Sequence, residues 1–351
     1  MSPRSMAGVM KKRVERHLHV AMACVLMALY VFVNGVPGRP PPPAEGCVGR
    51  GCHVQLLADT LHSRVKRPLG DKLQLDMTGA SWRSWQGDDP GSPCVDYETR
   101  FGHDVARVWL VSFPCSGNTW VRYLLESATG VFTGSAYKDK ILYEAGMFGE
   151  MEAPSSGRTL VQKTHGGAVY GSPQHDLLTR YSLINPHLPT ILLLRHPARA
   201  IISYWKFYTS RTRNNKHTAQ ISPSMFGGKG FRQFVAETTL LWEEVTTDRL
   251  LWSSGPLYVL HYEHLLQNTT HHLRHLLHFL RVQKDEGRMA CVSTHLTGSF
   301  KRSGNNSNFD PFTKDEKMRM TSAVKRVNRL LLLLGYPQPP VYEGFLVPTS
   351  L

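Results

Sequence analysis

The 351-residue sequence lacks the motifs by which a basic protein is usually assigned to nucleic-acid binding. It has no zinc-finger spacing, no heptad series, no RNA-binding aromatic signature and no internal repeat. Acidic residues are scarce, with 27 Asp and Glu against 41 Lys and Arg, so the formal net charge is +14. The excess favours a partner or substrate rich in sulfate, phosphate or carboxylate, and the missing motifs argue against nucleic acid.

Two common catalytic motifs are also missing. No G-x-x-x-x-G-K-S/T loop occurs, which argues against an ATPase or GTPase, and no H-E-x-x-H motif occurs. A group of histidines is the one candidate for a metal site: His261, His264, His271, His272, His275 and His278. His271, His275 and His278 lie on one side of a predicted helix, 270–280, and leucines form an apolar stripe on its other side. An ordinary amphipathic helix is therefore favoured, and we expect no metal.

Cysteine is infrequent, with six residues in the chain. Cys24 lies in an apolar N-terminal run, so five cysteines remain for the body of the protein, and an odd number leaves at least one unpaired. We predict a local Cys47–Cys52 disulfide and a longer Cys94–Cys291 disulfide. Cys115 would then be the free thiol.

Long apolar runs are limited to residues 18–33, which follow a basic segment. We interpret residues 1–17 as a cytosolic basic tail and 18–36 as a signal-anchor transmembrane helix; a cleaved signal peptide is the alternative. A proline-rich stem and lead-in, 37–104, precedes a catalytic domain, 105–351. This layout is typical of a Golgi-resident type II membrane enzyme with a luminal catalytic domain, although a secreted protein stays open. Sequons at Asn268 and Asn305 fit a luminal, glycosylated domain.

Apolar runs alternate with helical patterns through the body of the chain. Strands are predicted at 108–113, 159–163, 190–194 and 257–261, and helices at 119–129, 198–209, 231–252, 270–280 and 314–334. This alternation predicts an α/β fold in three layers, with a central parallel sheet.

The loop 114–120, P-C-S-G-N-T-W, joins the first predicted strand to the first helix. Strand, tight loop and helix form the geometry that holds a phosphate group against a helix N-terminus, although an ordinary helix N-cap is the alternative. The candidate ligand-binding residues are Cys115, Ser116, Gly117, Asn118, Thr119 and Trp120.

Two further pairs of residues favour transfer of an anionic group. Lys163 and His165 lie two residues apart at a predicted strand end, so they share a face, where His165 can accept a proton and Lys163 can stabilise developing charge. Arg195 ends the strand 190–194, and Ser203 lies in the following helix, so together they could hold a phosphate monoester. A later basic loop, with Lys301 and Arg302, could close on a nucleotide phosphate.

In this order, the four segments resemble the sulfotransferases that use 3′-phosphoadenosine 5′-phosphosulfate (PAPS). F-P-C-S-G-N-T-W is similar to the family's 5′-phosphosulfate loop, and K-T-H to the segment with its catalytic base. R-H-P-A-R-A-I-I-S resembles the 3′-phosphate motif, and F-K-R-S, followed by F-T, resembles its late loop. The resemblance implies PAPS as co-substrate, His165 and Lys163 as catalytic residues, and PAPS contacts from the loop 114–120, Arg195, Ser203, Lys301 and Arg302.

The form S-F-P-x-S-G-N-T-W-V-R-Y resembles the branch related to WSC-domain-containing sialate O-sulfotransferases, which are Golgi-anchored. This resemblance implies a sialylated glycoprotein or glycolipid as acceptor. The cysteine-rich WSC module itself is missing. Acceptor specificity would lie in two segments expected to be irregular, 135–156 and 209–230.

One departure from the family pattern concerns activity. The family's loop lysine, which stabilises the leaving phosphate, is Cys115 here. Lys163 remains, and Arg122, one turn into the helix, is a candidate to compensate in part. Two alternatives therefore stay open: a luminal pseudoenzyme that binds PAP or anionic glycans, and a nucleotide-dependent, kinase-like P-loop enzyme.

Overall fold

The computed structural model describes residues 73–171, 184–214, 222–298 and 309–342, all within one compact unit, Val54–Leu351. The predicted cytosolic tail, the predicted anchor, the stem up to residue 72 and the predicted Cys47–Cys52 disulfide lie outside the described residues. None of the helices within the described ranges has the length and apolarity needed to cross a bilayer.

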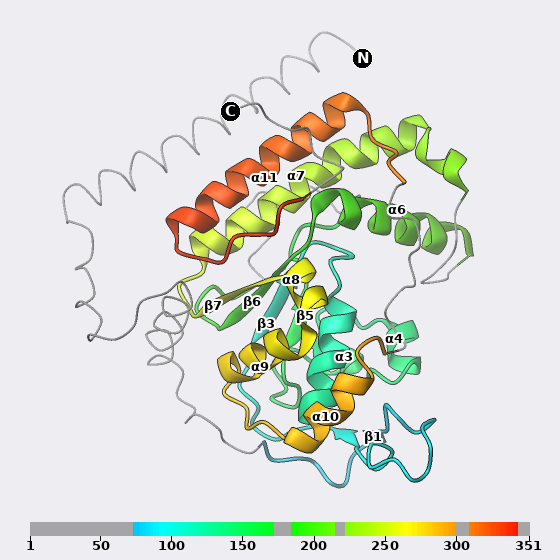
Figure 1. Ribbon diagram of the computed structural model, residues 1–351, viewed down its shortest axis with the longest axis vertical. Coiled ribbons are helices and arrows are strands. Elements are labelled where there is room, and N and C mark those ends of the chain that lie inside the picture. The colour runs from blue at the N-terminus through cyan, green and yellow to red at the C-terminus, as the bar shows by residue number, and fades with distance from the viewer. Residues whose placement is uncertain (1–72, 172–183, 215–221, 299–308, 343–351) are drawn as a thin grey trace, which may run out of the picture. The chain divides into compact units, whose positions relative to one another are not determined.

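Five strands form a parallel sheet in the order β4-β5-β3-β6-β7 (Figure 1). Their bounds are Trp109–Ser112 for β3, Gly134–Ser135 for β4, Gln162–Thr164 for β5, Thr190–Leu194 for β6 and Leu257–His261 for β7. Every pairing is parallel, which confirms the predicted central sheet. Strand β5 begins three residues later than predicted. Its outer neighbour, β4, is only two residues long, so β5 has few pairing partners on that side.

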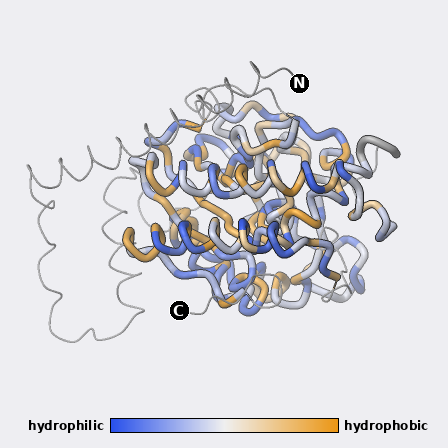
Figure 2. Tube along the Cα trace, turned by 90° about the horizontal axis from the view of Figure 1, so that it is seen from above, coloured by the Kyte–Doolittle hydropathy of each residue, from blue (hydrophilic) through white to orange (hydrophobic). Residues whose placement is uncertain are grey.

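Helices cover both faces of the sheet, because alternate residues of its strands point to opposite sides. Leu110, Ile191 and Leu193 pack against one layer, whose helices are α3 (Asn118–Thr129), α9 (Thr269–Phe279) and α10 (Glu286–Thr294). Val111 and Leu192 pack against the other layer, formed by α6 (Pro197–Asn214), α7 (Lys229–Trp252) and α11 (Lys314–Leu333) (Figure 1). Apolar and polar positions alternate along the covering helices (Figure 2), and the predicted three-layer α/β fold is confirmed.

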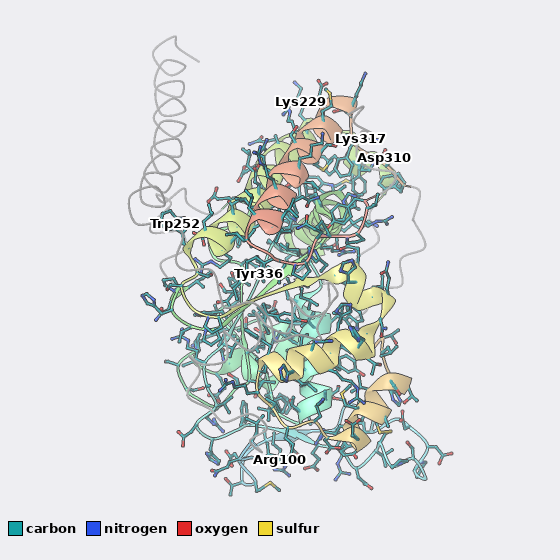
Figure 3. All side chains as sticks on the ribbon, turned by 60° about the vertical axis from the view of Figure 1, so that its left-hand side comes forward. Arg100, Lys229, Trp252, Asp310, Lys317 and Tyr336 are labelled. Carbon is teal, nitrogen blue, oxygen red and sulfur yellow. A yellow bond between two sulfur atoms is a disulfide. The ribbon has the colours of Figure 1, made fainter. Side chains whose placement is uncertain are left out.

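Helices α7 and α11 run side by side over the sheet, with their N-termini at the same end (Figure 1). Arg232 pairs with Glu316 near the start of both helices, and Arg326 pairs with Glu243 further along. Lys317 also pairs with Asp310, and both lie at the end of α7 marked by Lys229, away from Trp252 (Figure 3).

The sequence analysis missed the strand β4, the nine-residue helix α10 and several other short elements: β1 (Ser81–Trp82), β2 (Thr99–Arg100), α4 (Lys140–Glu144), η1 (Phe148–Met151), η2 (Pro223–Phe226) and α8 (Tyr262–Gln267). The expectation of irregular structure is wrong for part of 135–156, which contains α4 and η1. It is also wrong for part of 209–230, which contains the end of α6 and η2. Such short helices depend on local caps and tertiary contacts, and they carry little periodic signal. In α4 the cap is Asp139, whose side chain accepts from the N–H of Ile141.

The predicted Cys94–Cys291 disulfide is present and joins the lead-in segment to α10. Both cysteines are buried in the layer that contains α3 and α9. Cys115 is partly exposed and forms no disulfide within the described residues, as predicted.

Candidate active site

The sheet order brings the predicted functional segments to one edge. Strand β3 lies at the centre, and β5 and β6 pair with its two sides. The segments that leave the carboxyl ends of these three strands begin with Phe113, His165 and Arg195. In open α/β sheets a crevice forms at this edge, where successive connections turn to opposite sides. The phosphate-loop candidate, the Lys163–His165 pair and Arg195 therefore lie on the same edge of the sheet.

The loop between β3 and α3 has a backbone suited to binding an anion. Cys115 and Gly117 both adopt positive φ angles, 60° and 100°. Gly117 is the N-cap residue of α3, and no side chain among the described residues caps this helix. The first N–H groups of a helix have no partner within it, and the helix dipole makes this end positive. The loop therefore presents backbone donors where the sequence predicted a phosphate site.

Arg195 and Tyr262 hold the loop in place. The guanidinium of Arg195 donates through Nη1 to the carbonyl oxygen of Cys115, at 2.7 Å, and lies 4.5 Å above the ring of Tyr262. The same ring lies so close to Gly117 that a Cβ there would be 2.6 Å away. Arg195 was predicted to bind phosphate, and the structure also places it in contact with the loop. Tyr262 was not predicted; the only sequence signal is that it directly follows β7.

Two polar atoms in this region are buried without a hydrogen-bond partner in the described part of the chain. They are Oγ of Ser116 and Nε of Arg195. Buried polar groups in native proteins are normally satisfied, so such atoms indicate a site for a ligand or an ordered water. A hydroxyl and a guanidinium N–H are donors that suit phosphate or sulfate oxygens. These residues therefore fit an anionic group bound at the loop.

The remaining residues of the 5′ loop have structural contacts. The amide of Asn118 donates to the hydroxyl of Ser112, at 3.0 Å, and the hydroxyl of Thr119 donates to Asn118. Trp120 is buried, and its indole N–H donates to the carbonyl of Leu296, so its side chain anchors the loop in the core. Ser203 is half-buried on α6, which begins at Pro197, next to Arg195.

His165 has one ring nitrogen in place for general-base chemistry. Its Nδ1 lies 2.8 Å from the carbonyl oxygen of Ser112, which can only accept, so Nδ1 carries the proton and Nε2 has the free lone pair. The ring stacks on Tyr137, whose hydroxyl accepts from the backbone N–H of His165. Burial and the adjacent Lys163 lower the pKa of His165 to about 4, so the ring is neutral at physiological pH. Ser112 and Tyr137 were not predicted as site residues.

Lys163 lies beside His165, and both side chains contact Tyr137. Its ammonium is 3.5 Å from Glu150, which also pairs with Arg122. Burial lowers the pKa of Lys163 to about 8, although Glu150 opposes this shift.

The suggestion that Arg122 replaces the missing loop lysine is wrong. Arg122 is fully buried, and its guanidinium contacts Thr133 and Glu150, because its position on α3 faces the core.

Some predicted residues remain untested. Lys301, Arg302 and Asn305 lie outside the described residues. Asn268 is exposed as the N-cap of α9, where its side-chain oxygen accepts from His271, so glycosylation at Asn268 stays a prediction. Within α9, the rings of His271 and His275 pack edge to face. Within the described ranges, however, the one group of three ligand atoms close enough for a metal is Asp88, Cys94 and His295, and Cys94 is in a disulfide.

The parallel sheet, the phosphate-type loop after its central strand and the base at a neighbouring strand end define an α/β enzyme class that handles anionic groups. The particular family is the sulfotransferases: the model described as "Sulfotransferase domain" matches residues 106–328, and the chain belongs to this family, as predicted.

Curated relatives support the predicted branch. The chain is 34% identical over 234 residues to "WSCD family member CG9164" of Drosophila melanogaster. The matched region covers 66% of this chain and 67% of that protein. It is 33% identical over 227 residues to "WSCD family member GA21586" of Drosophila pseudoobscura pseudoobscura, and there the match spans 65% of the relative's length and 63% of this chain. Among solved structures, mouse sulfotransferase SULT7A1 complexed with PAP matches with a TM-score of 0.38 and 15% identity, over 64% of this chain and 85% of that one.

Proposed function

We propose that this protein is a Golgi type II membrane sulfotransferase that transfers the sulfuryl group of PAPS to a hydroxyl group of a glycoconjugate, with sialic acid as the acceptor sugar. The observation that carries the proposal is the tautomer of His165. Its Nδ1–H donates to Ser112, which leaves Nε2 free as a base beside Lys163 and one strand away from the phosphate-type loop. A protein that only binds glycans would need neither the tautomer nor the cation.

In the proposed reaction the acceptor oxygen attacks the sulfur of PAPS. A new S–O bond forms, the bond between sulfur and the phosphate oxygen breaks, and Nε2 of His165 takes the acceptor's proton. Lys163 stabilises the negative charge that develops on the departing phosphate oxygen. The loop 114–120 would bind the 5′ side of PAPS, and Arg195, Ser203, Lys301 and Arg302 would bind its 3′-phosphate. The products are PAP and a sulfate ester.

The acceptor and location rest on other arguments. The resemblance to the sialate O-sulfotransferase branch and the net charge of +14 support an anionic sugar as acceptor. Attachment to the Golgi membrane rests on the predicted anchor at residues 18–36 and on the predicted luminal disulfide chemistry, and Cys94–Cys291 is consistent with an oxidising compartment.

The test uses the full-length protein, purified from expressing cells and incubated with radiolabelled PAPS and a sialylated glycoprotein. One aliquot of the glycoprotein is first treated with sialidase. We expect label that depends on sialic acid and that falls at least about 100-fold in a His165→Ala variant, because the proton acceptor is lost. His275→Ala, a histidine of α9 outside the site, serves as the matched control and should keep wild-type activity.

The alternatives predict different results. Label that survives sialidase but needs His165 would keep the transferase and reject sialic acid. Wild-type protein that binds PAP and labels no acceptor would indicate the pseudoenzyme, which the cysteine in the loop favours. Phosphate transfer from ATP in the same assay would indicate the kinase-like alternative.

A further inference from the structure

Glu150 is a buried carboxylate next to the proposed catalytic pair, and the mechanism above gives it no role. It lies in η1, and its side chain has no exposed surface. One carboxylate oxygen contacts both the guanidinium of Arg122 and, at 3.5 Å, the ammonium of Lys163. The other accepts from the backbone N–H of Asp139, at 3.1 Å. Glu150 therefore joins α3, the segment before α4, and the end of β5.

The charges around Glu150 do not balance without it. Arg122 and Lys163 would face each other in the interior as two cations, and an uncompensated buried charge is costly. Arginine does not lose its proton in proteins, whereas a buried lysine does so readily. Asp139 also acts on Lys163 and favours its charged form, but to a smaller extent than Glu150. Removing the negative charge of Glu150 would therefore lower the pKa of Lys163 further. Glu126, the next carboxylate in this network, bonds to Thr133 and not to Lys163, so it does not substitute.

Glu150 also fixes the segment that borders His165. Asp139, which donates its N–H to Glu150, caps α4 with its side chain. Two residues earlier, Tyr137 stacks on His165 and is 40% exposed. Because one carboxylate holds both this segment and Lys163, the position of the Tyr137 ring relative to the cation depends on it.

We propose that Glu150 is a positioning residue: it keeps Lys163 as a cation at the transfer site and fixes the Tyr137 segment against His165. This inference rests on the proposed sulfotransferase function. Glu150 itself touches neither substrate, because its side chain is fully buried.

The test compares Glu150→Gln with wild type in rate against pH, using the full-length protein. Wild type needs neutral His165, whose pKa is about 4, and protonated Lys163, whose pKa is about 8, so the rate should be highest between these values. In Glu150→Gln the alkaline fall should move to lower pH, because the charge that raises the pKa of Lys163 is gone. At neutral pH we expect kcat to fall about 100-fold. The KM for PAPS should rise by a smaller factor.

Glu126→Gln is the matched control. It changes a buried carboxylate of the same network without touching Lys163, and it should keep the wild-type rate and pH profile. Glu150→Asp restores the charge and should return the alkaline fall to its wild-type position, with a lower kcat. If Glu150→Gln does not fold, Lys163→Arg decides: arginine does not lose its proton, so the alkaline fall should disappear, and a fall that stays at its wild-type position would contradict the proposal.

A second readout does not need turnover. In protein labelled with ¹³C at lysine Cε, the signal of Lys163 is assigned by its loss in Lys163→Arg, and its titration midpoint is followed by NMR. We expect a lower midpoint in Glu150→Gln than in wild type. An unchanged midpoint, or a lower rate with an unchanged pH profile, would reduce Glu150 to a structural residue. An inactive wild-type protein in which the midpoint still moves would reject only the proposed function.

Discussion

At the scale of single residues, the site depends on which atoms already have partners. Ser112 contributes its carbonyl to His165 and its hydroxyl to Asn118, so one residue of β3 connects the base to the phosphate-type loop. The carbonyl fixes the His165 tautomer, which no pattern of residue types can do. The same logic removes Arg122 from the site, because Thr133 and Glu150 occupy its donors.

Cys115 is the position at which the proposed reaction can be tested by adding a cation. Its thiol stands where the family pattern has a lysine, and its backbone already has the positive φ angle of the loop, 60°. In Cys115→Lys we expect the sulfate-transfer rate to rise about tenfold, because a second cation would reach the departing phosphate. Initial rates at saturating PAPS measure this.

Cys115→Met is the matched variant for this prediction. It lengthens the side chain without adding charge and should show no gain in rate. A Cys115→Lys protein that is folded but slower than wild type would mean that Lys163 alone supplies the charge, and that a second cation disturbs the loop.

At the scale of elements, the connection between β3 and α3 is tightly constrained. Gly117 combines a φ angle of 100° with the closely packed Tyr262 ring. In Gly117→Ala the new methyl group would meet that ring at 2.6 Å, so the loop must shift. We expect unfolding free energy to fall by about 1–3 kcal/mol and PAP affinity to fall about tenfold. Urea denaturation and calorimetric PAP titration measure the two effects.

Gly87→Ala is a suitable control for this change. Nothing lies within 4 Å of a Cβ at that glycine, so stability and PAP affinity should stay near wild type. If Gly117→Ala kept wild-type PAP affinity, the loop would not be the site of the 5′-phosphate.

The major elements were predictable because each has a strong local pattern. Strands β6 and β7 have the predicted bounds. Helices α3, α7, α9 and α11 begin and end within two residues of their own predicted bounds. The short elements were not predictable, because β4 has two residues and α4 has five. Tertiary partners stabilise them, such as the ladder to β5 and the contact between Asp139 and Glu150.

At the scale of the whole molecule, the Cys94–Cys291 disulfide joins residues 197 positions apart, from the lead-in segment to α10. Replacing both cysteines by serine should lower the unfolding free energy by about 4 kcal/mol. Without the cross-link the unfolded chain is no longer held in a long closed loop, so it gains conformational entropy. The denaturation midpoint is measured in a Cys115→Ser background, which prevents thiol exchange. A midpoint equal to that of the background would show that these cysteines are not paired in the native protein.

The sequence by itself determined the fold class, the family, the loop at 114–120 and the Lys163–His165 pair. Each of these depends on residue types at short spacing, or on a motif order that survives without coordinates. The tertiary structure decided which groups meet across elements: Ser112 with His165, Tyr262 with Gly117, and Glu150 with Arg122 and Lys163. These contacts join residues from different strands and helices. The sheet order brings them together, and no local sequence pattern predicts that order.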